Sequence, residues 1–165
     1  MIAPLPAAGR IAVPWKNGGG VTREVCVFPA GAGMDDFLWR ISMAEVTEAG
    51  PFSHFPGVDR HLTVLHGRLQ LDLGDERHVL NRLDSLDFDG EAPVHGTPIE
   101  GPVSDLNIMT RRGRVTALVR QAAGPVLTTA PVAVLIDLVT LDAVKFDPAP
   151  GHIVAPHPSI LIEFS

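Results

Sequence analysis

The chain has 165 residues and a formal net charge of −6, with 45% hydrophobic and 19% charged residues. A chain of this length forms one domain or two small lobes, and it buries enough surface to fold without a disulfide or a metal. The acidic balance, with no stripe of lysine and arginine, argues against nucleic acid as a partner. Cys26 is the only cysteine, which excludes a disulfide framework and a cysteine-based zinc site.

The chain shows neither a membrane segment nor a secretory leader. No apolar run reaches the roughly 18 residues that would span a bilayer. Residues 1–6 lack the basic and apolar regions of a signal peptide. We therefore expect a cytoplasmic protein without a membrane partner, and its oligomeric state, a homodimer included, stays open.

Glycine and proline are frequent, with 16 and 15 residues, and they are scattered rather than repeated. Frequent turns between short strands produce this pattern. No helical periodicity persists beyond about two turns. The sequence therefore predicts an all-β protein.

The first landmark is the segment 14–24, in which three consecutive glycines precede a strand pattern. Such glycines indicate a bulge, a tight corner, backbone amides turned toward a ligand, or a flexible turn. A strand is predicted over 21–28, and alternation assigns one of its faces to Thr22, Glu24 and Cys26.

A second strand is predicted over 37–46. Alternation assigns one face to Trp39, Ile41, Met43 and Glu45, and the other face to Arg40, Ser42, Ala44 and Val46. A long strand over 61–73 follows, with a bend or hairpin at Gly67. The side chains expected on its apolar face are those of Leu65, Leu69, Leu71 and Leu73.

Short strands are predicted over 78–80 and 85–88, whereas 93–103, with three prolines and two glycines, is predicted to be a loop. The next strand, over 105–111, should carry Asp105, Asn107 and Met109 on one face. A basic turn at 111–114 is expected to be solvated and leads to a strand over 115–120. Apolar strands over 132–141 and 159–164, separated by the turns 148–151 and 156–158, then predict a second sheet layer.

Several of these segments together resemble one protein family. The Val-Leu-x-Gly-x-Leu pattern within 61–71 is similar to the first motif of cupin barrels, and 14–20, 39–46, 50–53 and 105–113 resemble the HutD/Ves family. The resemblance implies an all-β, cupin-like barrel or sandwich, a two-lobed bicupin in one compact chain. Its first lobe would span roughly 15–120, and its second roughly 121–165 with contributions from the N-terminal segment. For HutD members it also implies a regulatory role beside the histidine-utilisation pathway.

Metal-binding cupins place His-x-His, a glutamate and a later histidine around one metal. This chain offers only His54 and His95 in the corresponding region, and Arg60 would put a positive charge where a cation should lie. We therefore expect neither a metal nor another cofactor.

Polar and charged residues on the predicted inner faces suit a small anionic metabolite. Guanidinium groups pair bidentately with carboxylates, and neutral side chains fix orientation. Acidic groups would hold the arginines or bind an amino or formimino group, with Trp15 and Trp39 as further walls. The predicted ligand-binding residues are Lys16, Asn17, Thr22, Glu24, Arg40, Ser42, Glu45, Phe52, Arg60, Asp105 and Asn107.

Three functions fit this pattern. The first is a non-catalytic regulatory cupin that senses or sequesters an acid of histidine catabolism, such as formylglutamate, formiminoglutamate or urocanate. The second is a cupin isomerase or hydrolase acting on a small carboxylate, either metal-dependent or with a carboxylate such as Glu45 as general base. The third is an interaction module in which the same charges form internal ion pairs. No nucleophile motif or intact metal triad is present, which favours binding over catalysis.

Overall fold

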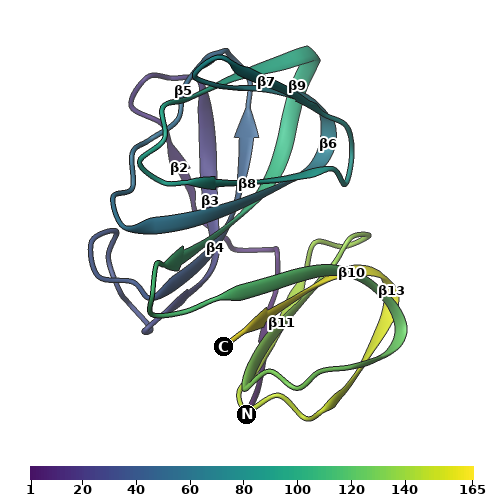
Figure 1. Ribbon diagram of the computed structural model, residues 1–165. Coiled ribbons are helices and arrows are strands. Elements are labelled where there is room, and N and C mark those ends of the chain that lie inside the picture. Colours follow the sequence, from purple (N-terminus) through teal and green to yellow (C-terminus); the bar gives the residue numbers. More distant parts are fainter. The chain divides into compact units, whose positions relative to one another are not determined.

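The computed structural model describes residues 1–165 and contains thirteen β-strands and no helix (Figure 1). None of the chain could therefore cross a membrane as a helix. The strands fall into two compact units. We call them the terminal unit, Met1–Arg10 with Gly113–Ser165, and the central unit, Ile11–Arg112.

The terminal unit is built on one antiparallel sheet of five strands. Their order is β1 (Ile2–Leu5), β12 (Ala143–Phe146), β11 (Val132–Asp137), β13 (His152–Phe164) and β10 (Ala117–Leu127). The strand nearest the N-terminus thus completes a sheet made otherwise from the last third of the chain. Its core cluster consists of Ala122, Ala133, Leu135, Ile153, Ala155 and Leu161.

The central unit is built on an antiparallel sheet of eight strands (Figure 1). Six lie in the order β2 (Ala12–Pro14), β3 (Gly20–Phe28), β4 (Trp39–Val46), β9 (Val94–Arg111), β6 (Val58–Leu73) and β7 (Glu76–Leu80). Two more strands, β5 (Gly50–Pro51) and β8 (Ser85–Asp89), pair with β9 and β6. The predicted all-β, cupin-like fold is confirmed, although both sheets are open rather than closed barrels.

Bulges shift the side-chain alternation in two strands of the central unit. In β3 the register slips between Glu24 and Cys26, so Cys26 pairs with Ile41 and lies on the face opposite Glu24. The prediction that both share one face was wrong, because a bulge inserts one residue and reverses the alternation beyond it.

The bend predicted at Gly67 is a double irregularity in β6, with register shifts on both sides of His66. Gly67 has a φ of 84°, and a Cβ there would come within 2.8 Å of the Pro102 carbonyl oxygen. The core face of β6 therefore carries Leu62 and Val64 before the bend and Leu69 and Leu71 after it. Leu65 was wrongly expected on this face.

The predicted loop at 93–103 is instead the first half of β9. Prolines fit there because β4 pairs only with residues 103–110, so residues 97–99 have a strand neighbour on one side alone and residues 100–102 are unpaired. The predicted turn at 156–158 lies within β13, where three residues bulge between Ala155 and Ser159.

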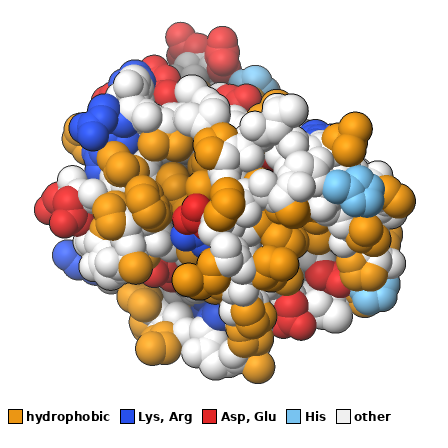
Figure 2. All heavy atoms as spheres, turned by 90° about the horizontal axis from the view of Figure 1, so that it is seen from below, with side chains coloured by type: hydrophobic (Ala, Val, Ile, Leu, Met, Phe, Trp, Pro, Cys, Tyr) orange, Lys and Arg blue, Asp and Glu red, His pale blue; other side chains and the backbone are white.

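Hydrophobic side chains also reach the surface. On the face of the molecule in Figure 2 they are numerous and interrupted by charged groups. The large apolar side chains most exposed in the terminal unit are those of Met1, Ile2, Leu118, Leu127, Val139 and Val154. Apolar atoms make up much of the surface of any folded protein, so this exposure alone identifies no partner.

Candidate functional site

The central unit encloses a cavity of about 520 Å³ that opens between its strands and connecting segments. Nine of the eleven predicted ligand-binding residues line it: Lys16, Asn17, Thr22, Arg40, Ser42, Phe52, Arg60, Asp105 and Asn107. The remaining lining residues are Val13, Pro14, Trp15, Met34, Ala44, Pro51, Ser53, Phe55 and Met109.

The sheet register explains how the polar residues come together. Asp105, Asn107 and Met109 alternate along β9, which confirms the predicted face. Ser42 on β4 lies opposite Asn107, and Arg40 lies opposite Met109. On the other side of β9, Arg60 from β6 also lies opposite Met109. The two arginines therefore project from the strands that flank β9.

Arg60 is 7% exposed, and aromatic rings surround its guanidinium. The rings of Phe88, Phe55 and Phe52 have their centroids 5.0, 5.3 and 5.7 Å from Cζ, close enough for cation–π attraction. Sequence reasoning missed Phe55 and Phe88. The β6–β8 register could have indicated Phe88, which pairs directly with Arg60.

The hydrogen bonds of Arg60 leave part of its donor capacity unused. Nη2 donates to Oδ1 of Asn107 at 2.9 Å, and Nη1 donates to the Ser53 carbonyl oxygen at 3.3 Å. The buried Nε has no partner. Burial, together with the nearby Arg40 charge, lowers the pKa of Arg60 to about 10, and Asp105 partly offsets this shift. Arg60 therefore stays charged at neutral pH.

Asp105 is 1% exposed and accepts a 2.6 Å hydrogen bond from Nδ2 of Asn107. Burial raises its pKa to about 7, against the opposing effects of Arg60 and of the Asn107 hydrogen bond. Asn107 thus joins a buried cation to a buried carboxyl group, because its amide accepts from Arg60 and donates to Asp105.

Arg40 is also 7% exposed, and its Nε donates to Oε2 of Glu24 at 3.0 Å. Nη1 makes only a long 3.5 Å contact with the Ser42 hydroxyl. Glu24 does not line the cavity, and its side chain is 46% exposed. Its structural role is to hold Arg40, one of the two roles expected for the acidic residues.

Glu45 and Trp39 are not part of the cavity wall. Both occur on the β4 face opposite Arg40, as alternation predicted. Glu45 accepts a 2.9 Å bond from Arg23 at the surface. Trp39 is buried and stacks against Phe28, with ring centroids 5.9 Å apart. The structure therefore places neither side chain within reach of a cavity ligand.

The glycine-rich segment forms the turn between β2 and β3 and supplies one rim of the cavity. Trp15 donates from Nε1 to the Thr22 hydroxyl at 2.8 Å, and its ring meets Phe52 edge-on at 6.2 Å. A Cβ on Gly20 would lie 2.4 Å from the Glu45 carbonyl oxygen and 3.1 Å from the Trp15 ring. Close packing of the backbone therefore requires glycine at position 20.

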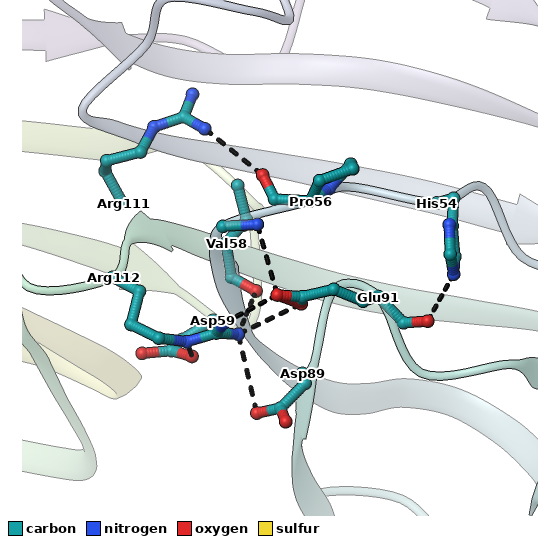
Figure 3. Close-up of polar contacts among 9 residues, drawn as sticks. His54, Pro56, Val58, Asp59, Asp89, Glu91, Arg111 and Arg112 are labelled. Carbon is teal, nitrogen blue, oxygen red and sulfur yellow. Dashed lines mark hydrogen bonds and ion pairs between the residues drawn. The ribbon is translucent and has the colours of Figure 1, made fainter.

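A charged network fixes the segment that carries Phe52, Ser53 and Phe55 (Figure 3). Arg112 donates to Asp59 at 2.7 Å and to both carboxylate oxygens of Glu91 at 2.5 and 3.1 Å. Glu91 accepts from the backbone N–H of Gly57 through its side chain and from His54 Nε2 through its carbonyl oxygen.

The same region shows contacts of His54 and Arg111 that differ from those expected from the sequence. His54, weighed as a metal ligand, instead binds the Glu91 backbone. Arg111, expected in a solvated turn, donates to the Phe37 carbonyl oxygen at 3.0 Å, and its guanidinium lies 5.0 Å from the Phe37 ring. Arginines of the basic turn therefore bind neighbouring segments rather than being only solvated.

The residues of the cavity do not form a cluster suited to a metal. No group of three or more His, Cys, Asp or Glu side chains in the chain is arranged to hold one. His95 lies on β9 opposite Asp72 and is outside the cavity wall. The hydrogen-bond donors that face the cavity are instead ammonium and guanidinium groups, side-chain amides and hydroxyls.

Comparison with known proteins identifies the family. The HutD family model matches residues 8–144. The chain belongs to the HutD family. It is 46% identical over 111 residues to the protein Ves of Citrobacter koseri, a match that covers 66% of this chain and 57% of Ves. It is also 41% identical over 100 residues to a 21.2 kDa protein from the hutC 3′ region of Pseudomonas putida, covering 59% and 52%.

The solved structure of HutD from Pseudomonas fluorescens SBW25 matches over the full chain. Its TM-score is 0.90 at 30% identity, and the match covers 100% of this chain and 98% of that structure. The sequence matches to Ves and to the Pseudomonas putida protein span only a little more than half of those proteins. Membership of the HutD family and the fold are therefore shown.

Proposed function

We propose that the cavity of the central unit binds a small carboxylic acid of histidine catabolism and that the protein acts as a regulatory, non-catalytic binder. The observation that carries this proposal is the pair of buried arginines, Arg40 and Arg60, on one cavity wall. Buried charges are costly unless they are paired, and the pairing available here is incomplete.

The charge balance favours an anion. Lys16, Arg40 and Arg60 face the cavity, and the acidic groups nearby are Glu24, engaged with Arg40, and Asp105. Asp105 has a pKa of about 7 and is only partly ionised near neutral pH. The positive groups therefore outnumber the negative ones, and a ligand carboxylate would supply the missing charge.

The walls favour a small, partly polar ligand. A cavity of about 520 Å³ lies within the range of roughly 300–1,000 Å³ that is usual for small-molecule sites. Trp15, Phe52 and Phe55 supply aromatic wall, while Asn107, Ser42 and Thr22 offer neutral hydrogen bonds. Formylglutamate, formiminoglutamate and urocanate each combine a carboxylate with a polar nitrogen. The names HutD and hutC among the relatives favour histidine catabolism as the source.

A cupin enzyme is the second candidate, and Asp105 is the observation that favours it. A buried carboxyl group with a pKa of about 7 is suited to general acid–base catalysis at neutral pH. The wall lacks a recognisable nucleophile–base pair, since no histidine or cysteine lines the cavity. Binding therefore remains the stronger proposal.

Thermal melting with N-formyl-L-glutamate, N-formimino-L-glutamate and urocanate tests the binding function. Ligand at a hundred times its dissociation constant should add about 2.7 kcal/mol of stability, which corresponds to several degrees of melting temperature. Arg60→Lys should lose most of the shift, because an ammonium cannot pair bidentately with a carboxylate. Arg114→Lys, in the turn after β9, is the matched control.

Two results would decide between the candidates. NMR spectra of each acid incubated with the protein should remain unchanged over hours if the protein only binds it. Appearance of product signals that vanish in Asp105→Asn would establish the enzyme instead. The absence of a melting shift with all three acids would contradict the binding proposal.

A further inference from the structure

Asp105 is the acidic group on a cavity wall that otherwise carries positive charge. The charged residues lining the cavity are Lys16, Arg40, Arg60 and Asp105, and no histidine lines it. Lysine and arginine keep their charge throughout the neutral range. A change in the charge of the cavity near neutral pH can therefore come only from Asp105.

The surroundings of Asp105 leave its negative charge weakly supported. Its neighbours across the sheet are Ala44 on β4 and Val64 on β6, both apolar and buried. Its side chain forms no ion pair, and its hydrogen-bond partner is the neutral amide of Asn107. Its negative charge is stabilised through space by Arg60 and by the hydrogen bond from Asn107, against the larger effect of burial.

Each element around Asp105 contributes identifiable groups. Charge comes from Arg60 on β6, from Arg40 on β4 and from Lys16 in the β2–β3 turn, while Glu24 on β3 is engaged with Arg40. The facing groups on β9 and β4, Asn107 and Ser42, are neutral. An anion that binds these cations must therefore share them with Asp105.

We propose that binding of a carboxylate in this cavity is coupled to uptake of one proton by Asp105, so that the site takes in an acid as an anion together with a proton. This inference rests on the proposed binding function. The proton comes from solvent, adds to the carboxylate oxygen of Asp105 and leaves that residue neutral. The bound anion then no longer competes with a charged Asp105 for the cavity cations, and two negative groups do not share the cavity wall.

The direction of the pH dependence follows from this coupling. Below about pH 7, Asp105 already carries its proton in the free protein, so affinity should not change with pH. At higher pH the ligand must bind together with a proton, and affinity should fall by up to about tenfold per pH unit. The carboxyl group of the ligand contributes nothing here, because it is ionised throughout this range.

Isothermal titration calorimetry with N-formyl-L-glutamate, and with formate as the minimal probe, tests the coupling. Dissociation constants measured from about pH 6 to about pH 9 should be level at first and then rise. At about pH 8, the binding enthalpy should differ between phosphate and Tris buffers, because the buffer supplies the proton. This second measurement uses the unaltered protein and does not depend on a variant that folds.

The matched variants are Asp105→Asn and Asp75→Asn. The first replaces the buried carboxyl group by a neutral amide, so binding should be independent of pH and of buffer, and tighter than wild type above about pH 8. The second removes an exposed carboxyl group from the turn before β7 and should behave as wild type.

The outcomes separate the coupling from the binding function. Binding that is equally tight across the pH range and takes up no proton would overturn the coupling and leave the binding function standing. The same holds if proton uptake persists in Asp105→Asn. Absence of binding by both probes at every pH would overturn both proposals.

Discussion

Arg60 and Asn107 are joined by a 2.9 Å hydrogen bond from Nη2 to the amide oxygen, and the same amide donates to Asp105 at 2.6 Å. The three side chains come from only two strands, β6 and β9. Asn107 satisfies both neighbours at once, because its amide accepts through the oxygen and donates through the nitrogen.

Replacing Asn107 by alanine should therefore destabilise the protein by about 1–3 kcal/mol, because buried polar groups on Arg60 and Asp105 lose their partner. Urea unfolding monitored by tryptophan fluorescence measures this change. Asn81→Ala, at an exposed position, should change stability by less than about 0.5 kcal/mol. A loss from Asn107→Ala no larger than that of the control would show that the amide link contributes nothing.

Glu24 and Glu45 offer a comparison across the two faces of one sheet. Glu24 holds Arg40 beside the cavity, and Glu45 holds Arg23 at the surface. Glu24→Gln should tighten binding of N-formyl-L-glutamate several-fold, because Arg40 then keeps its full charge for the ligand. Glu45→Gln should leave binding unchanged and cost at most about 1 kcal/mol of stability.

Calorimetry on the two glutamine variants checks this pair of expectations. Equal affinities would mean that Arg40 does not contact the ligand. A larger effect from Glu45→Gln would restore Glu45 to the candidate site, contrary to its position on the outer face of β4.

Arg112 should link acid stability to the segment that carries Phe52 and Phe55. Its hydrogen bonds to Glu91 lower the pKa of that carboxyl group to about 2, well below its ordinary value. A lowered folded-state pKa adds stability above the unfolded value, and this stability is lost as the pH falls from about 4.5 toward 2. Arg112→Ala should remove this contribution and lower the melting temperature at neutral pH.

Melting curves from about pH 7 down to about pH 2 measure the effect. The wild-type protein should lose stability across the acid range more steeply than Arg112→Ala. Arg114→Ala, with a neighbouring arginine replaced, should follow the wild-type curve. Parallel curves for Arg112→Ala and wild type would show that the charged network is stabilised in some other way.

Alternation along strands was enough to predict much of the cavity. The shared face of Asp105, Asn107 and Met109 follows from period two alone, and so does the separation of Arg40 from Glu45. Strand faces are local properties, and residues two apart must point the same way wherever the strand is regular. Most of the polar residues of the cavity wall could therefore be predicted from the sequence alone.

The parts of the fold and the cavity that were not predicted depend on features that leave no local pattern in the sequence. The sequence does not mark the bulge in β3, and Gly67 marks a bend without showing that the side-chain alternation reverses there. Phe88 and Phe55 contact Arg60 only because the folded chain brings their segments next to β6. The loop predicted at 93–103 is a strand because its prolines face no second neighbour, a fact of sheet order rather than of sequence.

The pH dependence of stability offers a test of Asp105 that requires no ligand. Its pKa is raised from an ordinary 3.8 to about 7, chiefly by burial. The folded state therefore holds a proton that the unfolded state has released between these two values. Stability should consequently fall as the pH rises from about 4 to about 7, by on the order of 4 kcal/mol at most.

Asp105→Asn should abolish this fall, because an amide does not titrate. Relative to the wild-type protein, the free energy of unfolding of the variant should increase steadily as the pH rises from about 4 to about 7. Above about pH 7 this difference, the stability gap, should stop growing. Urea unfolding at matched pH values measures the gap, and Asp75→Asn controls for loss of a surface charge. Since every other titrating group is common to wild type and variant, a gap that stays constant with pH would mean that Asp105 is ionised in the folded protein at all these pH values. Arg60 would then have to support its charge fully.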